Sequence, residues 1–386
     1  MKAPLRRFLI REAEGVREAD TLVLGTGVLV GETAGGLPEL LGVPGGEIFL
    51  QPSGGDDTQA IRDALATGKD VRLGPGTFNI STITLGSGSG STEKGQWLIG
   101  SGVNRTRVNL VGGDVGISVR ASHCGIEGLL LSGVHYTMGR IGIQAAFDPT
   151  PAPPRGHLTI RSVRCEQMET AIRLENVSVC TIEDVSVFKT AYEGIYARGV
   201  SSGVLRNVAV SNVDALAGIY FESCAGIVCE SLLVQHCDGY SIQVYGGSGY
   251  RLSAVRVQAS DFTGPTVLVT GHASGVVVDC LDVSTEIIAI SLTQARDVTL
   301  NSCRVSGALA SLMISGSENV LVGAFRSEFT QSTHLHVSGS TGVFVTGMYV
   351  SGTGTVNVSA AGSRVLFGPN NFPAGSIVSG GNYAAL

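Results

Sequence analysis

Two sets of polar and aromatic residues recur about every 23 residues in the middle of the chain. Each member of the first set is followed two positions later by a member of the second, and the sets are Arg173, Tyr196, Tyr220 and Gln243, and Glu175, Arg198, Glu222 and Tyr245. Aromatic faces beside carboxylate, amide and guanidinium groups suit sugar rings, which offer both C–H faces and hydroxyl groups. If folding stacks these residues on one outer wall, they predict a carbohydrate-binding surface. The alternative is a ladder of charged and aromatic residues that only stabilises a sheet.

The acidic residues of this region could also cleave a glycosidic bond. Hydrolysis needs two carboxyl groups about 5–5.5 Å apart for retention or about 6.5–9.5 Å apart for inversion. Glu175 and Glu222 stand two repeats apart, which would separate them by about 9.6 Å at the strand spacing of a sheet and suits inversion. Asp214 and Asp238 fall in neighbouring turns and form a second candidate pair. These four residues are the catalytic candidates if the protein is an enzyme.

A polysaccharide lyase is the other enzymatic alternative. A lyase needs a base and a group that neutralises the carboxylate of a uronate, and Arg198 or Lys189 could supply that positive charge. The seven histidines show no metal-ligand spacing, and His334 and His336 alternate across a strand instead of converging. The sequence therefore predicts no metal and no other cofactor.

The elements that must position these residues are short alternating runs rich in valine and isoleucine, separated by Gly, Ser, Asn or Asp. From about residue 157 they fall into rows of about 23 residues, a period that indicates a solenoid. Aliphatic residues share columns down the rows, and one column is Ile172, Ile195, Ile219, Ile242, Val267, Ile290, Leu312, Leu335 and Val356. Like residues stack when each coil lies directly on the last, and no row has the 3.6-residue period of a helical repeat. The predicted fold class is all-β, a single-stranded right-handed parallel β-helix.

A different pattern precedes the rows. In "GGDDTQAIRDALATGKD", Asp56 or Asp57 can cap a short helix from Thr58 to Leu65, whose apolar face would cover the open first coil. "VRLGPGTFNI" then indicates a strand, a Pro–Gly turn and a second strand. The order "GDDT-AI--AL", then "V-LGPGTF-I", resembles the opening motif of the pectate-lyase-like right-handed β-helix superfamily, which is common in bacteriophage tailspikes and polysaccharide depolymerases. The resemblance implies the same fold, a homotrimer and a polysaccharide partner.

We expect four parts along the chain. Residues 1–50 are predicted to be an attachment or assembly segment, 51–112 the capping helix and first coils, 113–362 the β-helix, and 363–386 a C-terminal cap. Residues 133–156 are predicted to be a loop insertion, because proline in "DPTPAPP" lacks the N–H that strand pairing needs. One outer row contains the candidates for contact with a neighbouring subunit, which are Leu233, Arg256, Asp282, Arg304, Arg326 and Tyr349.

The composition argues against nucleic-acid-binding and membrane-spanning proteins. The 386 residues include 26 Lys and Arg against 32 Asp and Glu, and the net charge of −6 argues against nucleic acid as the partner. No apolar stretch is long enough to span a membrane, and "MKAPLRRFLIREAEGVREAD" has no signal-peptide core. The eight cysteines form no CxxC pair, and several fall at apolar positions. Buried free thiols in a protein made in a reducing cytosol are therefore expected.

These observations favour a bacteriophage tailspike or tail-fibre protein that binds host-surface polysaccharide, with or without depolymerising it. The expected location is the phage tail, after synthesis in the host cytoplasm, and residues 1–50 would contact other tail proteins. Two alternatives stay open. One is a binding-only or structural fibre, and the other is a bacterial extracellular polysaccharide lyase or epimerase.

Overall fold

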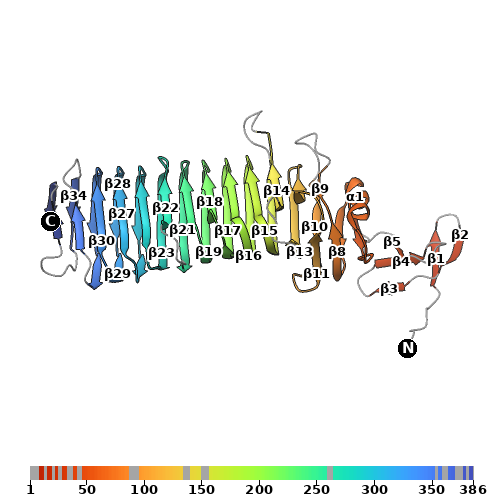
Figure 1. The fold of residues 1–386 in the computed structure, drawn as a ribbon. Helices are drawn as coiled ribbons and strands as arrows, with labels where there is room; N and C mark the ends of the chain where they lie inside the picture. The colour runs from red at the N-terminus through yellow and green to blue at the C-terminus, as the bar shows by residue number, and fades with distance from the viewer. Residues whose placement is uncertain are drawn as a thin grey trace.

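The computed structural model describes residues 46–86, 95–133, 140–148, 156–258, 264–352, 355–358 and 364–369. It gives backbone strands alone for parts of 1–45 and 377–385. Almost all of the described chain is strand, wound into a long solenoid in which each coil pairs in parallel with the next (Figure 1). The architecture is therefore the all-β parallel solenoid that the rows predict.

Three parallel ladders form the walls of the described solenoid. The first ladder contains β6 (Glu47–Leu50), β7 (Asp70–Leu73), β10 (Trp97–Ile99), β13 (Cys124–Gly133), β15 (His157–Glu175), β16 (Val179–Arg198), β17 (Ser202–Val213), β19 (Ile227–Cys237), β21 (Ser248–Gln258), β23 (Ser274–Ser284), β25 (Arg296–Asn301), β28 (Glu318–Gly323), β31 (Thr341–Thr346), β34 (Arg364–Phe367) and β36 (Asn382–Ala385). The second ladder contains β8 (Gly76–Ile80), β11 (Thr106–Leu110), the later parts of β13, β15, β16, β17, β19, β21 and β23, and then β26 (Arg304–Ser306), β29 (Arg326–Thr330) and β32 (Tyr349–Gly352).

The third ladder holds the residues that the sequence marks for chemistry. It contains β9 (Ile83–Leu85), β12 (Val115–Val119), β14 (Ile141–Ala146), the ends of β15 and β16, β18 (Ala217–Glu222), β20 (Tyr240–Tyr245), β22 (Pro265–Thr270), β24 (Ile288–Thr293), β27 (Ala310–Ser315), β30 (Thr333–Ser338), β33 (Thr355–Val358) and β35 (Ile377–Ser379). Because β15 and β16 each run through all three ladders, bends in the strand separate the walls there.

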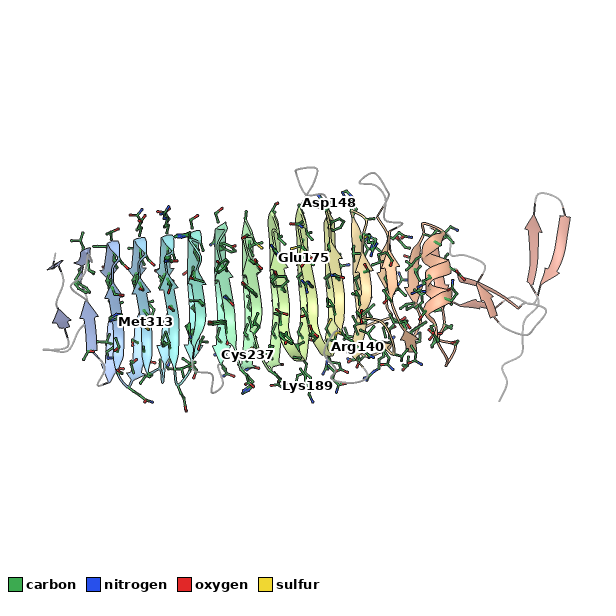
Figure 2. All side chains as sticks on the ribbon, turned by 45° about the horizontal axis from the view of Figure 1, so that its top comes forward. Arg140, Asp148, Glu175, Lys189, Cys237 and Met313 are labelled. Carbon is green, nitrogen blue, oxygen red and sulfur yellow. The ribbon has the colours of Figure 1, made fainter. Side chains whose placement is uncertain are left out.

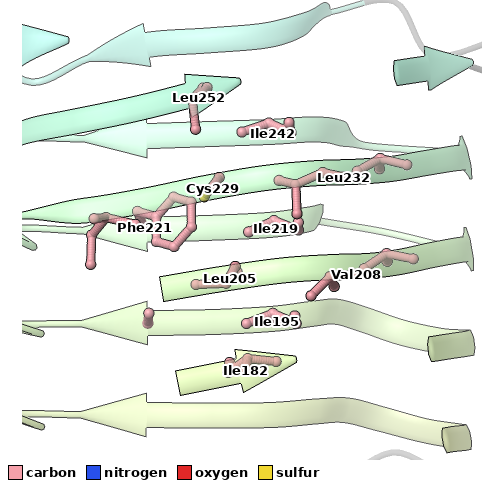
Figure 3. Close-up of a cluster of buried hydrophobic side chains, with 14 of the residues drawn as sticks. Ile182, Ile195, Leu205, Val208, Ile219, Phe221, Cys229, Leu232, Ile242 and Leu252 are labelled. Atoms are coloured by element: carbon pink, nitrogen blue, oxygen red, sulfur yellow. The ribbon is translucent and has the colours of Figure 1, made fainter. Parts of the chain in front are cut away.

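The interior is filled by the predicted columns of aliphatic side chains. The column from Ile172 to Val356 is paired rung by rung, and every member is at most 2% exposed. Figure 3 shows Ile195, Ile219 and Ile242 one above another. Burial of one such side chain contributes about 1.5–3 kcal/mol, and a slip of one residue would turn the column outward. The core therefore fixes the register of the outer residues as well.

A residue in the left-handed region ends successive strands of the third ladder. The φ angle is 55° at Asn176, 61° at Gly199, 52° at Ser223 and 66° at Gly246. Glycine adopts this region without a steric penalty and asparagine at a small one. The recurring corner turns each coil at the same position, so the outward residues before it stay in line.

The helix expected over Thr58–Leu65 is present as α1 (Thr58–Ala66) and lies at the N-terminal end of the solenoid in Figure 1. Its buried side chains include Ile61 and Leu65. The Oδ1 of Asp56 accepts a hydrogen bond from the Thr58 N–H over 2.9 Å. Asp57 occupies the N-cap position, but its carboxylate accepts from the N–H groups of other segments. Protection of the open core by this helix stays a prediction.

Three predicted boundaries need correction. The supposed loop at 133–156 contains β14, which pairs with β12 and β15 and buries Ile143 and Ala145. The proline-rich run that follows it hid this alternation, and most of that run lies outside the described residues. Likewise, ladder pairing continues through β34 and β36 inside the predicted cap at 363–386, because Val365 and Phe367 still alternate inward. The first ladder also already includes Glu47–Leu50.

The backbone before the solenoid forms separate antiparallel pairings. β1 (Phe8–Glu12) pairs with β2 (Gly15–Ala19), and β4 (Val28–Glu32) pairs with both β3 (Leu22–Leu24) and β5 (Pro38–Leu40).

All eight cysteines of the chain are free thiols, seven of them buried and Cys280 exposed. None of the helices in the described ranges is both long and apolar enough to cross a membrane.

Candidate functional site

The third ladder brings the predicted binding residues onto one outer surface. Its register pairs Arg173 with Tyr196, Tyr196 with Tyr220, and Tyr220 with Gln243. The second outer row is paired in the same way, in the order Glu175, Arg198, Glu222 and Tyr245. We call the surface formed by these eight residues the tyrosine face. The stacking that the 23-residue spacing predicts is therefore present.

Arg173 is held in place by its neighbours on this face. Its Nε and Nη2 donate hydrogen bonds to Oε1 of Glu175 over 3.0 and 2.8 Å, and its guanidinium lies 5.3 Å from the ring centre of Tyr196. Burial disfavours the charged guanidinium, but the hydrogen bonds and the charge of Glu175 outweigh it and raise the pKa of Arg173. The side chain is therefore a fixed cation that lies over the ring of Tyr196.

The two tyrosines form the centre of the face. The rings of Tyr196 and Tyr220 are 5.4 Å apart at an interplanar angle of 61°, an edge-to-face pair. The Oη of Tyr196 donates to Oε2 of Glu222 over 2.5 Å, and Nε of Arg198 lies 3.7 Å from the other oxygen of Glu222. Burial and the carboxylate of Glu222 raise the pKa of Tyr196, so its hydroxyl stays protonated. A continuous polar network thus runs from Glu175 through both tyrosine-bearing strands.

Glu193 belongs to the same surface, although its spacing marks it only as one of several turn acids. The Oγ1 of Thr170 donates to Oε2 of Glu193 over 2.6 Å, and the two residues are paired on adjacent coils. Burial raises the pKa of Glu193, and the Thr170 hydrogen bond and the Arg173 charge offset this only in part. A carboxyl group that tends to keep its proton is suited to act as a general acid.

An apolar corner borders the tyrosine face on the side where its strands begin. Tyr192 is 39% and Leu216 is 42% exposed. The corner repeats from coil to coil, because Leu216 N–H donates to the Tyr192 carbonyl and Tyr240 N–H donates to the Leu216 carbonyl, each over 3.0 Å. Spacing alone does not mark this corner, because its residues fall in irregular turns. Tyr245, at the other end of β20, is 46% exposed.

The predicted catalytic residues divide into two groups. Glu175 and Glu222 lie on the tyrosine face two coils apart, with Arg198 paired between them. Asp214 and Asp238 directly follow Val213 and Cys237, which are paired, so these aspartates do occupy neighbouring turns. Both are exposed, but they precede β18 and β20, whereas Glu222 lies at the opposite end of β18. The structure therefore does not bring the two pairs together.

The side chains considered for lyase or metal chemistry are dispersed. Lys189 lies at the edge of the solenoid, apart from Glu175 in Figure 2, whereas Arg198 is on the tyrosine face. Within the described ranges, no group of three or more His, Cys, Asp or Glu residues is arranged to hold a metal ion. His334 points into the core and His336 outward, which agrees with the predicted alternation.

The candidates for subunit contact also form an outer row. Leu233, Arg256, Asp282, Arg304, Arg326 and Tyr349 are paired in this order along the second ladder. Arg304 and Arg326 both bind Glu328, at 2.8 and 2.5 Å, and Arg326 lies 5.4 Å from the ring centre of Tyr349. This wall is distinct from the tyrosine face.

Comparison with known proteins establishes the handedness of the fold. A family model described as "Right handed beta helix region" matches residues 170–323. The chain is also similar to the A-module of mannuronan C-5 epimerase AlgE6 from Azotobacter vinelandii, with 15% identity and a TM-score of 0.51. That match covers 86% of this chain and 96% of the other. The predicted right-handed parallel β-helix is therefore confirmed.

Two other solved structures match the chain at TM-scores below 0.5. Tailspike protein 2 of Escherichia coli bacteriophage CAB120 has 12% identity and a TM-score of 0.48, over 93% of this chain and 49% of the tailspike chain. The catalytic domain of a GH87 alpha-1,3-glucanase has 14% identity and a TM-score of 0.47, over 87% of this chain and 67% of the other. No curated protein matches the sequence. Similarity at this level concerns the fold and not the reaction.

Proposed function

We propose that the tyrosine face binds a polysaccharide chain. The observation that supports this most directly is the edge-to-face pair of half-buried tyrosines, Tyr196 and Tyr220, in which Tyr196 contacts both Arg173 and Glu222. Sugar rings pack on aromatic faces while their hydroxyl groups bond to neighbouring carboxylates and amides.

The fold itself does not need this concentration of tyrosine and charge. Further along the same outer row, the third ladder continues with Leu268, Ser291 and Met313, and the coils remain paired in register. Figure 2 shows Met313 well along the solenoid from Glu175. A purely structural ladder would explain cross-strand contacts, but it would not explain why the aromatic and charged residues are confined to a few adjacent coils.

Affinity electrophoresis through gels that contain surface polysaccharides tests this proposal. Tyr220→Ala should weaken retention at least about tenfold, equivalent to about 1.4 kcal/mol. Tyr349→Ala on the second ladder is the matched control, because it removes a tyrosine ring from another wall, where an arginine lies beside it as Arg173 lies beside Tyr196. Equal retention of Tyr220→Ala and the wild type would contradict the proposal.

Depolymerisation is a second candidate function, and the half-buried carboxyl of Glu193, with its raised pKa, is the observation that favours it. A glycosidase needs one carboxyl group that stays protonated to donate to the leaving oxygen, and a second that is ionised. We propose Glu193 for the first role and keep Glu175 and Glu222 as candidates for the second. If the protein cleaves a glycan, Glu193→Gln should abolish chain shortening and leave gel retention intact. Chain shortening by Glu193→Gln at the wild-type rate would refute the assignment.

We further propose that the protein is a tailspike or tail-fibre component of a virion and that it forms a homotrimer. This rests on the resemblance of the opening motif "GDDT-AI--AL" and "V-LGPGTF-I" and on the outer row from Leu233 to Tyr349. Light scattering of the purified protein should give a mass close to three times the chain mass of 39.8 kDa. A monomer at micromolar concentration would contradict the trimer.

A further inference from the structure

The charges on the tyrosine face indicate which class of polysaccharide it can take. Among the described residues of this face and its corner, two arginines stand beside three glutamates, which are Arg173, Arg198, Glu175, Glu193 and Glu222. Figure 2 also places Asp148 at the edge of the solenoid nearest Glu175. Carboxyl groups therefore outnumber guanidinium groups on this surface, and even with Glu193 protonated both arginines are neutralised by Glu175 and Glu222.

Both arginines are already paired with carboxylates. Arg173 gives two hydrogen bonds to Glu175 and covers the Tyr196 ring, and Arg198 lies 3.7 Å from Glu222. A uronate or another acidic sugar could reach only the remaining N–H donors of these arginines, directly beside the carboxylates that already neutralise them. It would then lie beside these negative charges, which repel it.

A neutral sugar carries no charge that the carboxylates of this surface could repel. Its hydroxyl groups are hydrogen-bond donors, and an ionised carboxylate offers about four acceptor positions. Both hydrogen bonds from Arg173 reach the same oxygen of Glu175, whose side chain is 23% exposed, so acceptor positions remain. The carboxylate of Glu222, at 25% exposure, is likewise open to solvent on one side. Neutral chains therefore gain hydrogen bonds without breaking an ion pair.

We infer that the tyrosine face takes a neutral, hydroxyl-rich glycan, such as a hexose or N-acetylhexosamine chain, and excludes polyuronates. This inference depends on the proposed function, because it specifies the ligand of the same surface. It also predicts that binding changes little with salt, since no net ion pair forms with the ligand.

A panel of immobilised neutral and uronate-containing polysaccharides, probed with the full chain at low and high ionic strength, tests this inference. The wild type should bind one or more neutral chains, with less than about a twofold change in affinity between 50 and 500 mM salt, and should not bind the uronate chains. Glu175→Gln removes the partner of Arg173 and should introduce salt-sensitive binding of a polyuronate such as alginate. Glu230→Gln, which removes the same charge and the closer of the two carboxylate partners of Arg206 on the first ladder, is the matched control and should introduce none.

The possible results distinguish a failure of the neutral-ligand inference from a failure of the proposed function. Salt-sensitive binding of a polyuronate by the wild type, lost in Tyr220→Ala, would overturn the neutral-ligand inference and keep the tyrosine face as the binding site. Absence of binding to every chain on the panel would count against the proposed function itself. If Glu230→Gln gained polyuronate binding as strongly as Glu175→Gln, the effect would reflect net charge alone and the inference would fail.

Discussion

Acid should destabilise the C-terminal coils through one buried histidine. His334 on β30 is 0% exposed, and its Nδ1 lies 2.6 Å from Oγ of Ser327. Its Nε2 has no hydrogen-bond partner among the described residues. The nearby polar groups are the hydroxyls of Ser311, Ser327 and Thr330, which bond to one another and carry no charge. Nothing in this cluster compensates a positive charge on the ring.

The sign and size of the effect follow from this environment. Burial lowers the pKa of His334 from its ordinary value of 6.5, so the unfolded chain binds the proton more readily than the folded one. Stability is therefore complete above pH 6.5 and falls as the pH drops below it, by at most about 1.4 kcal/mol per pH unit until the folded histidine also protonates. At pH 5.5 the loss from this residue should be at most about 1.4 kcal/mol.

Urea unfolding of the wild type, His334→Asn and His336→Asn at pH 7.5 and 5.5 measures this effect. The loss of unfolding free energy between the two pH values should be smaller in His334→Asn than in the wild type, by up to this amount. His336 faces outward two residues further along the same strand, so its substitution should leave the loss as in the wild type. Equal losses in the wild type and His334→Asn would refute the reasoning.

Three further predictions concern the core and the turns. Ellman's reagent should titrate one thiol per native chain, that of Cys280, and all eight after denaturation; more than one fast-reacting thiol in the native protein would contradict the burial of the other seven. Phe221→Ala should lower the unfolding free energy by about 3–5 kcal/mol in chemical denaturation, because the ring is fully buried; a loss under about 1 kcal/mol would argue against that packing. Gly247→Ala should lower the melting temperature far more than Gly249→Ala. Both glycines have positive φ, but an added Cβ meets the Cys224 carbonyl oxygen at 1.9 Å at Gly247 and no atom closer than 3.4 Å at Gly249; equal effects would contradict this packing.

The stacking of coils could be predicted from sequence because side chains of one kind return at one spacing. Ile195, Ile219 and Ile242 mark the interior, and the residue after each of them then had to point outward. Tyr196 and Tyr220 were placed together on that basis, and the register confirms it. When coils stack in register, the repeat length alone predicts which residues of adjacent coils become neighbours.

The position of Glu193 could not be predicted from the alternation of inward and outward residues along a strand. Gly194 and Ile195 are both buried, so alternation is interrupted at the corner and Glu193, which is half-buried, lies on the side of Tyr196. The raised pKa of Glu193 depends on Thr170 and on burial at that corner, neither of which a spacing rule describes. Strand β14 was missed for a related reason, since the prolines after it suggested a loop across the whole segment.

The central claim is that a polysaccharide contacts the tyrosine face. Hydroxyl-radical footprinting with mass spectrometry, carried out with and without a bound glycan, tests this claim at the level of single side chains. Tyr196, Tyr220 and Tyr245 should lose reactivity when the glycan binds, while Tyr349 on the second ladder should keep it. Protection of Tyr349 with unchanged reactivity of Tyr196 and Tyr220 would contradict the account.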